Sequence, residues 1–226
     1  MSRQGVGIAL EATEAELQAW LSEFDPTAEA VEVVVALRHR RQSRQLSGWT
    51  SWILLLGPEG ADDGEDRRLA RSVVASNPTG LRRLDAVRIQ PGLDMIDPPR
   101  DGQEARLRQS IEYISSHPGS REEYYETQTQ FSGPAVRRLF EHDRFGRFLG
   151  VEVSERLVDD QTLPPWDVVH VAGLTMAQRL RAAPHYHRAF NAAARAIGEP
   201  SAKTVMRRWS SQRTIITANV EQIFPL

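Results

Sequence analysis

His170 is the residue of this sequence best suited to acid–base chemistry. It lies in an otherwise apolar segment, Asp-Val-Val-His-Val-Ala-Gly, that starts at Asp167. A histidine titrates near neutral pH and can therefore both accept and donate protons. A core histidine with satisfied hydrogen bonds would give the same pattern. The strand register decides between the two interpretations, because a shift of one residue turns every side chain to the opposite face.

Two charged residues alternate with valines in the β-branched segment before His170. Glu152 and Arg156 share one face of that strand, and we expect the valines to pack under helices while the charges point into a cavity. If Glu152 lies opposite His170, its carboxylate could fix the imidazole tautomer, and Arg156, near Trp166, could stabilise an anionic or enolate oxygen. If Val153 lies there instead, the pair does not form. The charges would then lie on a solvated rim.

Aromatic residues are candidates for lining such a cavity. Trp166 opens the segment that carries His170, and Tyr124 and Tyr125 lie in a helical stretch earlier in the chain. Aromatic side chains in these positions normally pack in the core. We predict substrate-binding roles for Trp166 and for one or both tyrosines at the cavity mouth.

Metal and thiol chemistry have little support. The chain has no cysteine, which excludes disulfides, thiolate nucleophiles and cysteine-ligated metals. His185 and His187 are two residues apart, so on a helix their rings would point about 200° apart and could not easily share a metal. We predict no metal site. His142, His185 or His187 could instead be a single axial ligand of haem, with a surface position as the alternative.

Charge and motifs exclude several partners. The chain has 226 residues with 28 basic and 30 acidic side chains, and the net charge of −2 gives no footprint for nucleic acid. The basic run at 38–44 fits a solvated hairpin loop. Nucleotide-binding, zinc-protease and serine-hydrolase motifs are absent.

No apolar run approaches the roughly 20 residues that span a bilayer, and the start of the chain lacks a secretion signal, so we expect a cytoplasmic protein.

The elements that must position these residues occur twice in the same order. In the first half, Thr13 and Glu16 form a capping box that predicts the start of a helix. The expected order is strand, helix, strand, strand, helix, strand, at 5–10, 13–25, 31–37, 49–56, 66–76 and 84–89. A proline-rich segment, 94–106, follows as a linker. The order then repeats at 107–115, 121–143, 148–157, 166–173, 175–197 and 204–216.

A βαββαβ unit places both helices on one face of an antiparallel sheet and leaves the other face to be covered. This arrangement resembles the dimeric α+β barrel superfamily. The helix from Thr175 to Ala183, followed by Pro184, His185 and Tyr186, is similar to EthD-like members, with Pro184 opening a second helical segment. The predicted fold is α+β, with tandem ferredoxin-like repeats packed sheet to sheet as an intrachain α+β barrel. Its domains would be 1–93 and 107–226, joined by the linker 94–106.

The resemblance implies a small-molecule enzyme, because the superfamily includes cofactorless oxygenases, cyclases and isomerases as well as haem enzymes. We expect a cofactor-independent cyclase, isomerase, dehydratase or oxygenase that acts on an aromatic or polyketide-like substrate. His170 would be the acid–base, Glu152 its orienting carboxylate and Arg156 the anion stabiliser. The alternatives are a haem-dependent enzyme and a non-catalytic ligand-binding barrel. The expected partners are a small-molecule substrate and, in a homodimer, a second copy of the chain.

Overall fold

The computed structural model describes residues 3–24, 32–40, 48–58, 64–90, 93 and 108–222. They pack into two compact units that interleave along the chain. The first unit comprises Met1–Ile89, Glu152–Pro165 and Ala218–Leu226, and the second comprises Gln90–Val151 and Trp166–Thr217. The division into sequential domains, 1–93 and 107–226, stays a prediction. The predicted linker 94–106 lies outside the described residues, as do positions 41–44 of the basic run.

The secondary structure confirms the α+β fold class and the repeated order. The first half contains β1 (Gln4–Leu10), α1 (Glu14–Phe24), β2 (Glu32–His39), β3 (Ser51–Leu56), α2 (Glu65–Ala75) and β4 (Leu81–Ile89). The second half contains β5 (Arg108–Ser116), α3 (Arg121–Thr127), a π-helical turn (Gln128–Ser132), α4 (Gly133–Glu141), β6 (Arg147–Asp159), β7 (Val168–Leu174), α5 (Met176–Ala196), α6 (Ala202–Ser211) and β8 (Arg213–Gln222). An origin by duplication stays a prediction.

The sheet of the first unit has the strand order β8, β2, β3, β1, β4, β6, where β8 and β6 contribute their C-terminal parts. Strands β1 to β4 and the β2–β8 pair run antiparallel. The predicted capping box starts α1: the Thr13 amide donates to Glu16 Oε2 at 2.8 Å, and the Glu16 amide donates to Thr13 Oγ1 at 3.3 Å. Helices α1 and α2 bury Leu17, Trp20 and Leu69 in one apolar cluster with the sheet.

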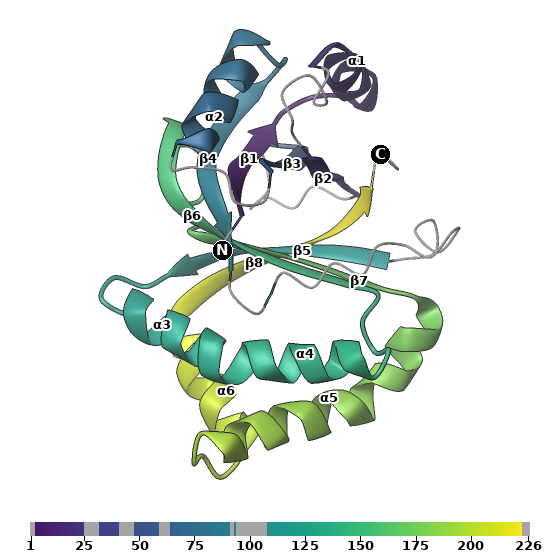
Figure 1. Ribbon diagram of the computed structural model, residues 1–226, viewed down its shortest axis with the longest axis vertical. Coiled ribbons are helices and arrows are strands. Elements are labelled where there is room, and N and C mark those ends of the chain that lie inside the picture. The colour runs from purple at the N-terminus through teal and green to yellow at the C-terminus, as the bar shows by residue number, and fades with distance from the viewer. Residues whose placement is uncertain are drawn as a thin grey trace. The chain divides into compact units, whose positions relative to one another are not determined.

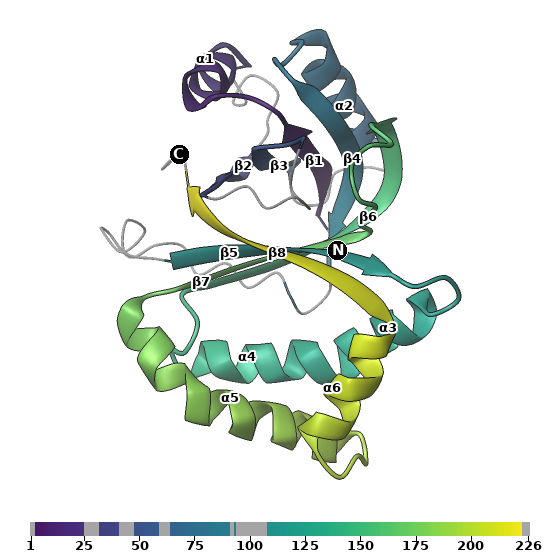
Figure 2. The ribbon, with the colours of Figure 1, turned by 180° about the vertical axis from the view of Figure 1, so that it is seen from behind.

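The sheet of the second unit has the order β8, β5, β7, β6, with the N-terminal parts of β8 and β6. Helices α4, α5 and α6 lie along one face of this sheet (Figure 1; Figure 2). Phe131, Leu139, Phe190 and Val205 form the centre of the core on that face. Strands β5 and β7 pair antiparallel.

Two details of the second unit differ from the sequence-based expectation. The segment 204–211, expected to be extended, is helical, because Ser201 caps α6 and Val205 and Trp209, four residues apart, share its buried face. Pro184 does not separate two helices but lies inside the continuous α5. Pro184 and Leu180 are both exposed, so water can hydrate the Leu180 carbonyl group that proline leaves without a donor. Among the described residues, no helix combines the length and the apolar character that crossing a membrane requires.

A candidate acid–base site in the second unit

The second unit contains a cavity of about 300 Å³ between its sheet and its own helices. The expected site was a space between two facing sheets, so this cavity lies on a different face from the one predicted. The sheet contributes Glu112, His170 and Arg213 to its polar lining, and the π-helical turn contributes Ser132. Its apolar lining includes Phe145, Phe148, Tyr186, Phe190, Met206 and Trp209. A concave apolar site with a few polar groups is the usual form of a small-ligand site.

His170 and Glu112 face each other across the β5–β7 pair. The register places the two residues directly opposite, and His170 Nδ1 lies 3.8 Å from Glu112 Oε2. His170 is 4% exposed, whereas the Glu112 side chain is 41% exposed and reaches solvent. Contact with His170 lowers the pKa of the Glu112 carboxyl below its ordinary value, against the effect of burial, and Arg213 adds to the lowering. Glu112 is therefore ionised at neutral pH.

The other ring nitrogen of His170 is enclosed by two buried amides. Nε2 lies 2.9 Å from Gln128 Nε2 and 3.2 Å from Gln90 Oε1. The Gln128 amide also donates to Gln90 Oε1 at 2.6 Å. With these assigned amide orientations, a neutral ring accepts at Nε2 and carries its proton on Nδ1, toward Glu112. A protonated ring can donate from Nε2 to Gln90, so both charge states find partners.

Local backbone features bring the two amides to His170. Gln128 begins the π-helical turn Gln128–Ser132, and such turns are frequent at functional sites. Gln90 follows β4, and its amide N–H donates to the carbonyl of Gly150 in β6 at 2.9 Å. Gly150 leaves room for the Gln90 amide, because a Cβ at this position would lie 2.6 Å from Gln90 Oε1 and 3.0 Å from Leu93 Cβ.

Gly150→Ala is expected to push the Gln90 amide away from His170 and to lower the free energy of unfolding by about 1–3 kcal/mol. Urea denaturation measures the loss, and a crystal structure of the variant locates the amide. In a Gln90→Ala background the cost should shrink, because one of the two clashes is gone. An unchanged unfolding free energy together with an unmoved Gln90 would contradict this account.

Arg213 supplies the cation of the cavity. It begins β8, and its guanidinium carbon lies 3.4 Å from the centroid of the Trp209 ring and 5.7 Å from that of Tyr124. Burial lowers the pKa of Arg213, while Tyr124 and Glu112 act in the opposite direction. An arginine stays charged under such conditions because its ordinary pKa is so high. Burial likewise raises the pKa of Tyr124, which keeps that phenol neutral.

The aromatic residues expected to bind substrate lie outside the cavity lining. Trp166 is 2% exposed and packs against Tyr113, with ring centroids 5.0 Å apart. Tyr124 is fully buried and stacks on Trp209, and Tyr125 meets Tyr124 edge to face. Tyr124 therefore packs against Trp209 and Arg213, which line the cavity, without lining it itself.

Glu152 and Arg156 belong to the first unit and have partners there. Glu152 forms an ion pair with Arg88. Arg156 lies 3.5 Å from Asp85 Oδ1 and 4.0 Å from Asp159 Oδ1. The carboxylate opposite His170 is Glu112 of β5 and not Glu152 of β6, because β5 pairs with β7 in the register that places Glu112 beside His170.

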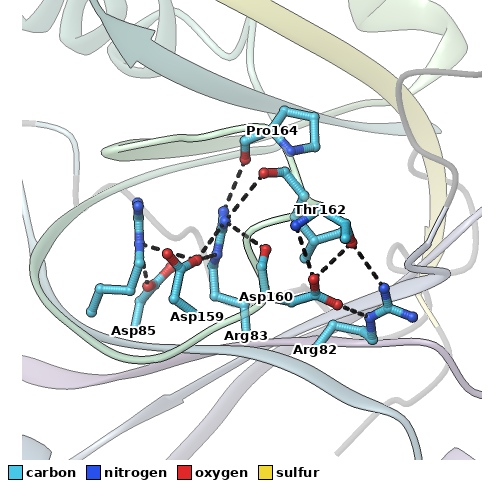
Figure 3. Close-up of polar contacts among 9 residues, drawn as sticks. Arg82, Arg83, Asp85, Asp159, Asp160, Thr162 and Pro164 are labelled. Atoms are coloured by element: carbon cyan, nitrogen blue, oxygen red, sulfur yellow. Dashed lines mark hydrogen bonds and ion pairs between the residues drawn. The ribbon is translucent and has the colours of Figure 1, made fainter.

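The contacts of Arg156 belong to a larger charged cluster in the first unit, centred on Arg83 (Figure 3). Arg83 is 1% exposed and donates to Asp159 Oδ1 at 2.8 Å and to the Pro164 carbonyl at 2.9 Å. Its neighbour Arg82 donates to Asp160 Oδ2 at 2.5 Å. The cluster joins the end of β6 and the turn after it to β4.

The described residues do not fit a haem. His142 and His187 are exposed, His185 is half-buried, and none of the three is among the residues that line the cavity. Both ring nitrogens of His170 face protein groups, so neither offers a free lone pair to iron. The cavity lies at the lower end of the range for drug-sized ligands, which are smaller than a haem. No cluster of metal-ligating side chains occurs within the described ranges.

The basic run is neutralised where the structure describes it. Arg38 Nη1 lies 3.0 Å from Glu14 Oε2, and Arg40 Nε lies 3.5 Å from Glu221 Oε2. Both pairs lie within the first unit. Arg38 and Arg40 therefore do not form an unpaired basic surface for a polyanion such as nucleic acid.

No family model matches the sequence, and no curated protein matches it. Solved structures do resemble it. A protein of Lactobacillus acidophilus NCFM, provisionally named a monooxygenase, is 7% identical with a TM-score of 0.52, over 99% of this chain and 94% of that one. A second protein so named, from Fusobacterium nucleatum, is 11% identical with a TM-score of 0.50, over 99% and 93% of the two chains. A chlorite dismutase variant from Candidatus Nitrospira defluvii is 8% identical with a TM-score of 0.49, over 98% and 92%.

At such low identities the likeness is one of fold. For the two solved structures with TM-scores of 0.52 and 0.50, the match extends over nearly the whole chain. The closer similarity to EthD-like proteins stays a prediction. The chain has the α+β fold that these solved structures share.

Proposed function

We propose that this protein is a small-molecule enzyme whose second unit moves protons with His170 and Glu112, without a metal or nucleotide cofactor. The observation that carries the proposal is the pairing of a buried histidine with an ionised carboxylate at the wall of an aromatic-lined cavity. Titratable pairs of this kind in clefts are frequent at catalytic sites. In this proposal Glu112 takes the role predicted for Glu152, and Arg213 takes the role predicted for Arg156.

The geometry suits a substrate hydroxyl or enol between the two groups. The 3.8 Å between His170 Nδ1 and Glu112 Oε2 allows one substrate oxygen to lie at hydrogen-bond distance from both. The ionised Glu112 carboxylate accepts the substrate proton, and Nδ1–H of His170 donates a hydrogen bond to the substrate oxygen. Arg213 stabilises the resulting substrate anion.

A histidine–carboxylate pair that converts a substrate to its phenolate or enolate anion could catalyse several reactions of the predicted classes. Isomerisation, cyclisation and dehydration each proceed through such an anion. Oxygenation is the first reaction to test, because two of the structural neighbours are provisionally named as monooxygenases. In that case the electron-rich anion reduces dioxygen, which is the oxidant. The alternative is a non-catalytic ligand-binding protein that uses the same cavity.

The test is a turnover screen of the purified protein with hydroxylated aromatic compounds and 1,3-dicarbonyl compounds. Product formation is followed by mass spectrometry, and oxygen consumption by an electrode. We expect turnover by the wild type, a decrease of about 10²-fold or more in Glu112→Gln, and no change in Glu122→Gln, an exposed residue of α3. Compounds that bind without conversion would support the binding protein instead.

Glu112 also gives a pH dependence of stability. Its folded pKa lies below the ordinary value of 4.5, so its ionised form stabilises the fold above that pH. The contribution disappears as the pH falls through the lower folded pKa. The difference in unfolding free energy between wild type and Glu112→Gln, measured by urea denaturation, should therefore be larger at pH 7 than at about pH 3. A difference that does not change with pH would refute the coupling to His170.

A further inference from the structure

We infer that the cavity of the second unit recognises a planar aromatic acid, and that Arg213 binds its anionic group. This inference deepens the proposed function and uses the same site. It concerns the chemical class of the ligand, whereas the proposed function concerns what His170 and Glu112 do to it.

The first argument is the charge of Arg213. It lines the cavity, and within the described part of the chain it forms no ion pair. Glu112 attracts Arg213 electrostatically, but its carboxylate is directed to His170. Placing a cation in a largely apolar cavity without a paired anion is costly. A ligand that carries a negative charge removes this cost.

The second argument is a surplus of hydrogen-bond donors beside Arg213. Arg213 Nε and Trp209 Nε1 are both buried, and neither has an acceptor. Nearly all buried polar groups in native proteins have a partner, so two such donors at one cavity require an explanation. Both nitrogens can only donate. An oxyanion that reaches the guanidinium would supply an acceptor for these nitrogens.

The third argument is the shape and chemistry of the walls. Phe148 and Phe190 come from the sheet and from α5, and the Trp209 ring, stacked under the guanidinium, is 4% exposed. Such walls favour a flat ring over a hydrated ion such as phosphate. The volume of about 300 Å³ suits one or two fused rings. The negative charge of Glu112 near the mouth disfavours a second anionic group, so the ligand is a monoanion.

The experiment compares two ligands that differ only in charge. Binding of 2-naphthoate and 2-naphthamide to the wild-type protein is measured by isothermal titration calorimetry. We expect the carboxylate to bind about 10-fold to 100-fold more tightly than the amide, since a charge-assisted pair contributes that much. Arg213→Gln should remove the difference. Arg207→Gln, at an exposed position of α6 in the same unit, should keep it.

Each outcome decides the inference. Equal binding of the two ligands by the wild type, or binding of neither, would overturn it without any variant. A preference for the carboxylate that persists in Arg213→Gln would assign the anion site elsewhere and also overturn it. Because the measurement needs no turnover, a protein that binds naphthoate through Arg213 but converts no compound would refute the proposed function alone.

Discussion

Replacement of His170 by asparagine is expected to lower kcat/KM by about 10²-fold to 10⁴-fold, the range that a general acid or base contributes. Asparagine retains a hydrogen-bonding group near Glu112 but cannot transfer a proton. The ring of His170 lies between Glu112 and the two amides, so its removal abolishes the group that links them. Steady-state kinetics on a substrate from the turnover screen measures the effect.

His187→Asn provides the matched control for this prediction. His187 is exposed on α5 and does not line the cavity, so kcat/KM should not change. Circular dichroism and thermal unfolding establish that both variants are folded. Unchanged turnover in a folded His170→Asn protein would exclude His170 as the acid–base group.

Replacement of Arg83 by methionine is expected to lower the free energy of unfolding by about 1–3 kcal/mol, because buried backbone carbonyl groups lose their donor. The Arg83 side chain is 2% exposed, and burial lowers its pKa. Methionine fills the space of the side chain but leaves the Asp159 carboxylate and the carbonyl of Pro164 without the donor that Figure 3 shows. Urea denaturation of the whole chain measures the loss.

Arg82→Met is the matched comparison, because the neighbouring arginine makes its ion pairs closer to solvent. Its side chain is 27% exposed, and its partners Glu11 and Asp160 are 52% and 24% exposed. Such pairs contribute about 0–1 kcal/mol. If Arg82→Met lowers the free energy of unfolding as much as Arg83→Met does, the burial of Arg83 does not make its contacts more stabilising than those of Arg82.

The sequence was sufficient for the order of the elements because their signals are local. The capping box at Thr13 and the alternation in the strands depend only on nearby residues. The β-branched residues that end the segment 204–216 predict an extended conformation for all of it. The Ser201 cap and the buried Trp209 instead make 204–211 helical. Pro184 in the middle of α5 shows the same limit, since an exposed carbonyl makes a helical proline tolerable.

The candidate site required information that local patterns do not contain. The types of residue were anticipated: a histidine, an orienting carboxylate and an arginine. The residues that supply the last two are Glu112 and Arg213, because the pairing of β5 with β7 and the entry of β8 bring them to His170. Glu112 gave the same signal as His170, a titratable residue among the apolar residues of a strand, and could have been found by it. The contribution of Gln128 depends on a π-helical turn that no sequence pattern marked.

Proton resonances and ¹⁵N chemical shifts of the His170 ring provide the most direct test of the central claim, that His170 faces a ligand cavity together with Glu112. The spectra are recorded with and without saturating 2-naphthoate, in the wild type and in Glu112→Gln. We predict that the neutral form of the ring carries its proton on Nδ1, that the ring signals shift when the ligand binds, and that the tautomer preference is lost in Glu112→Gln. Ring signals that respond neither to the ligand nor to the Glu112 substitution would contradict the claim and leave His170 as a core residue.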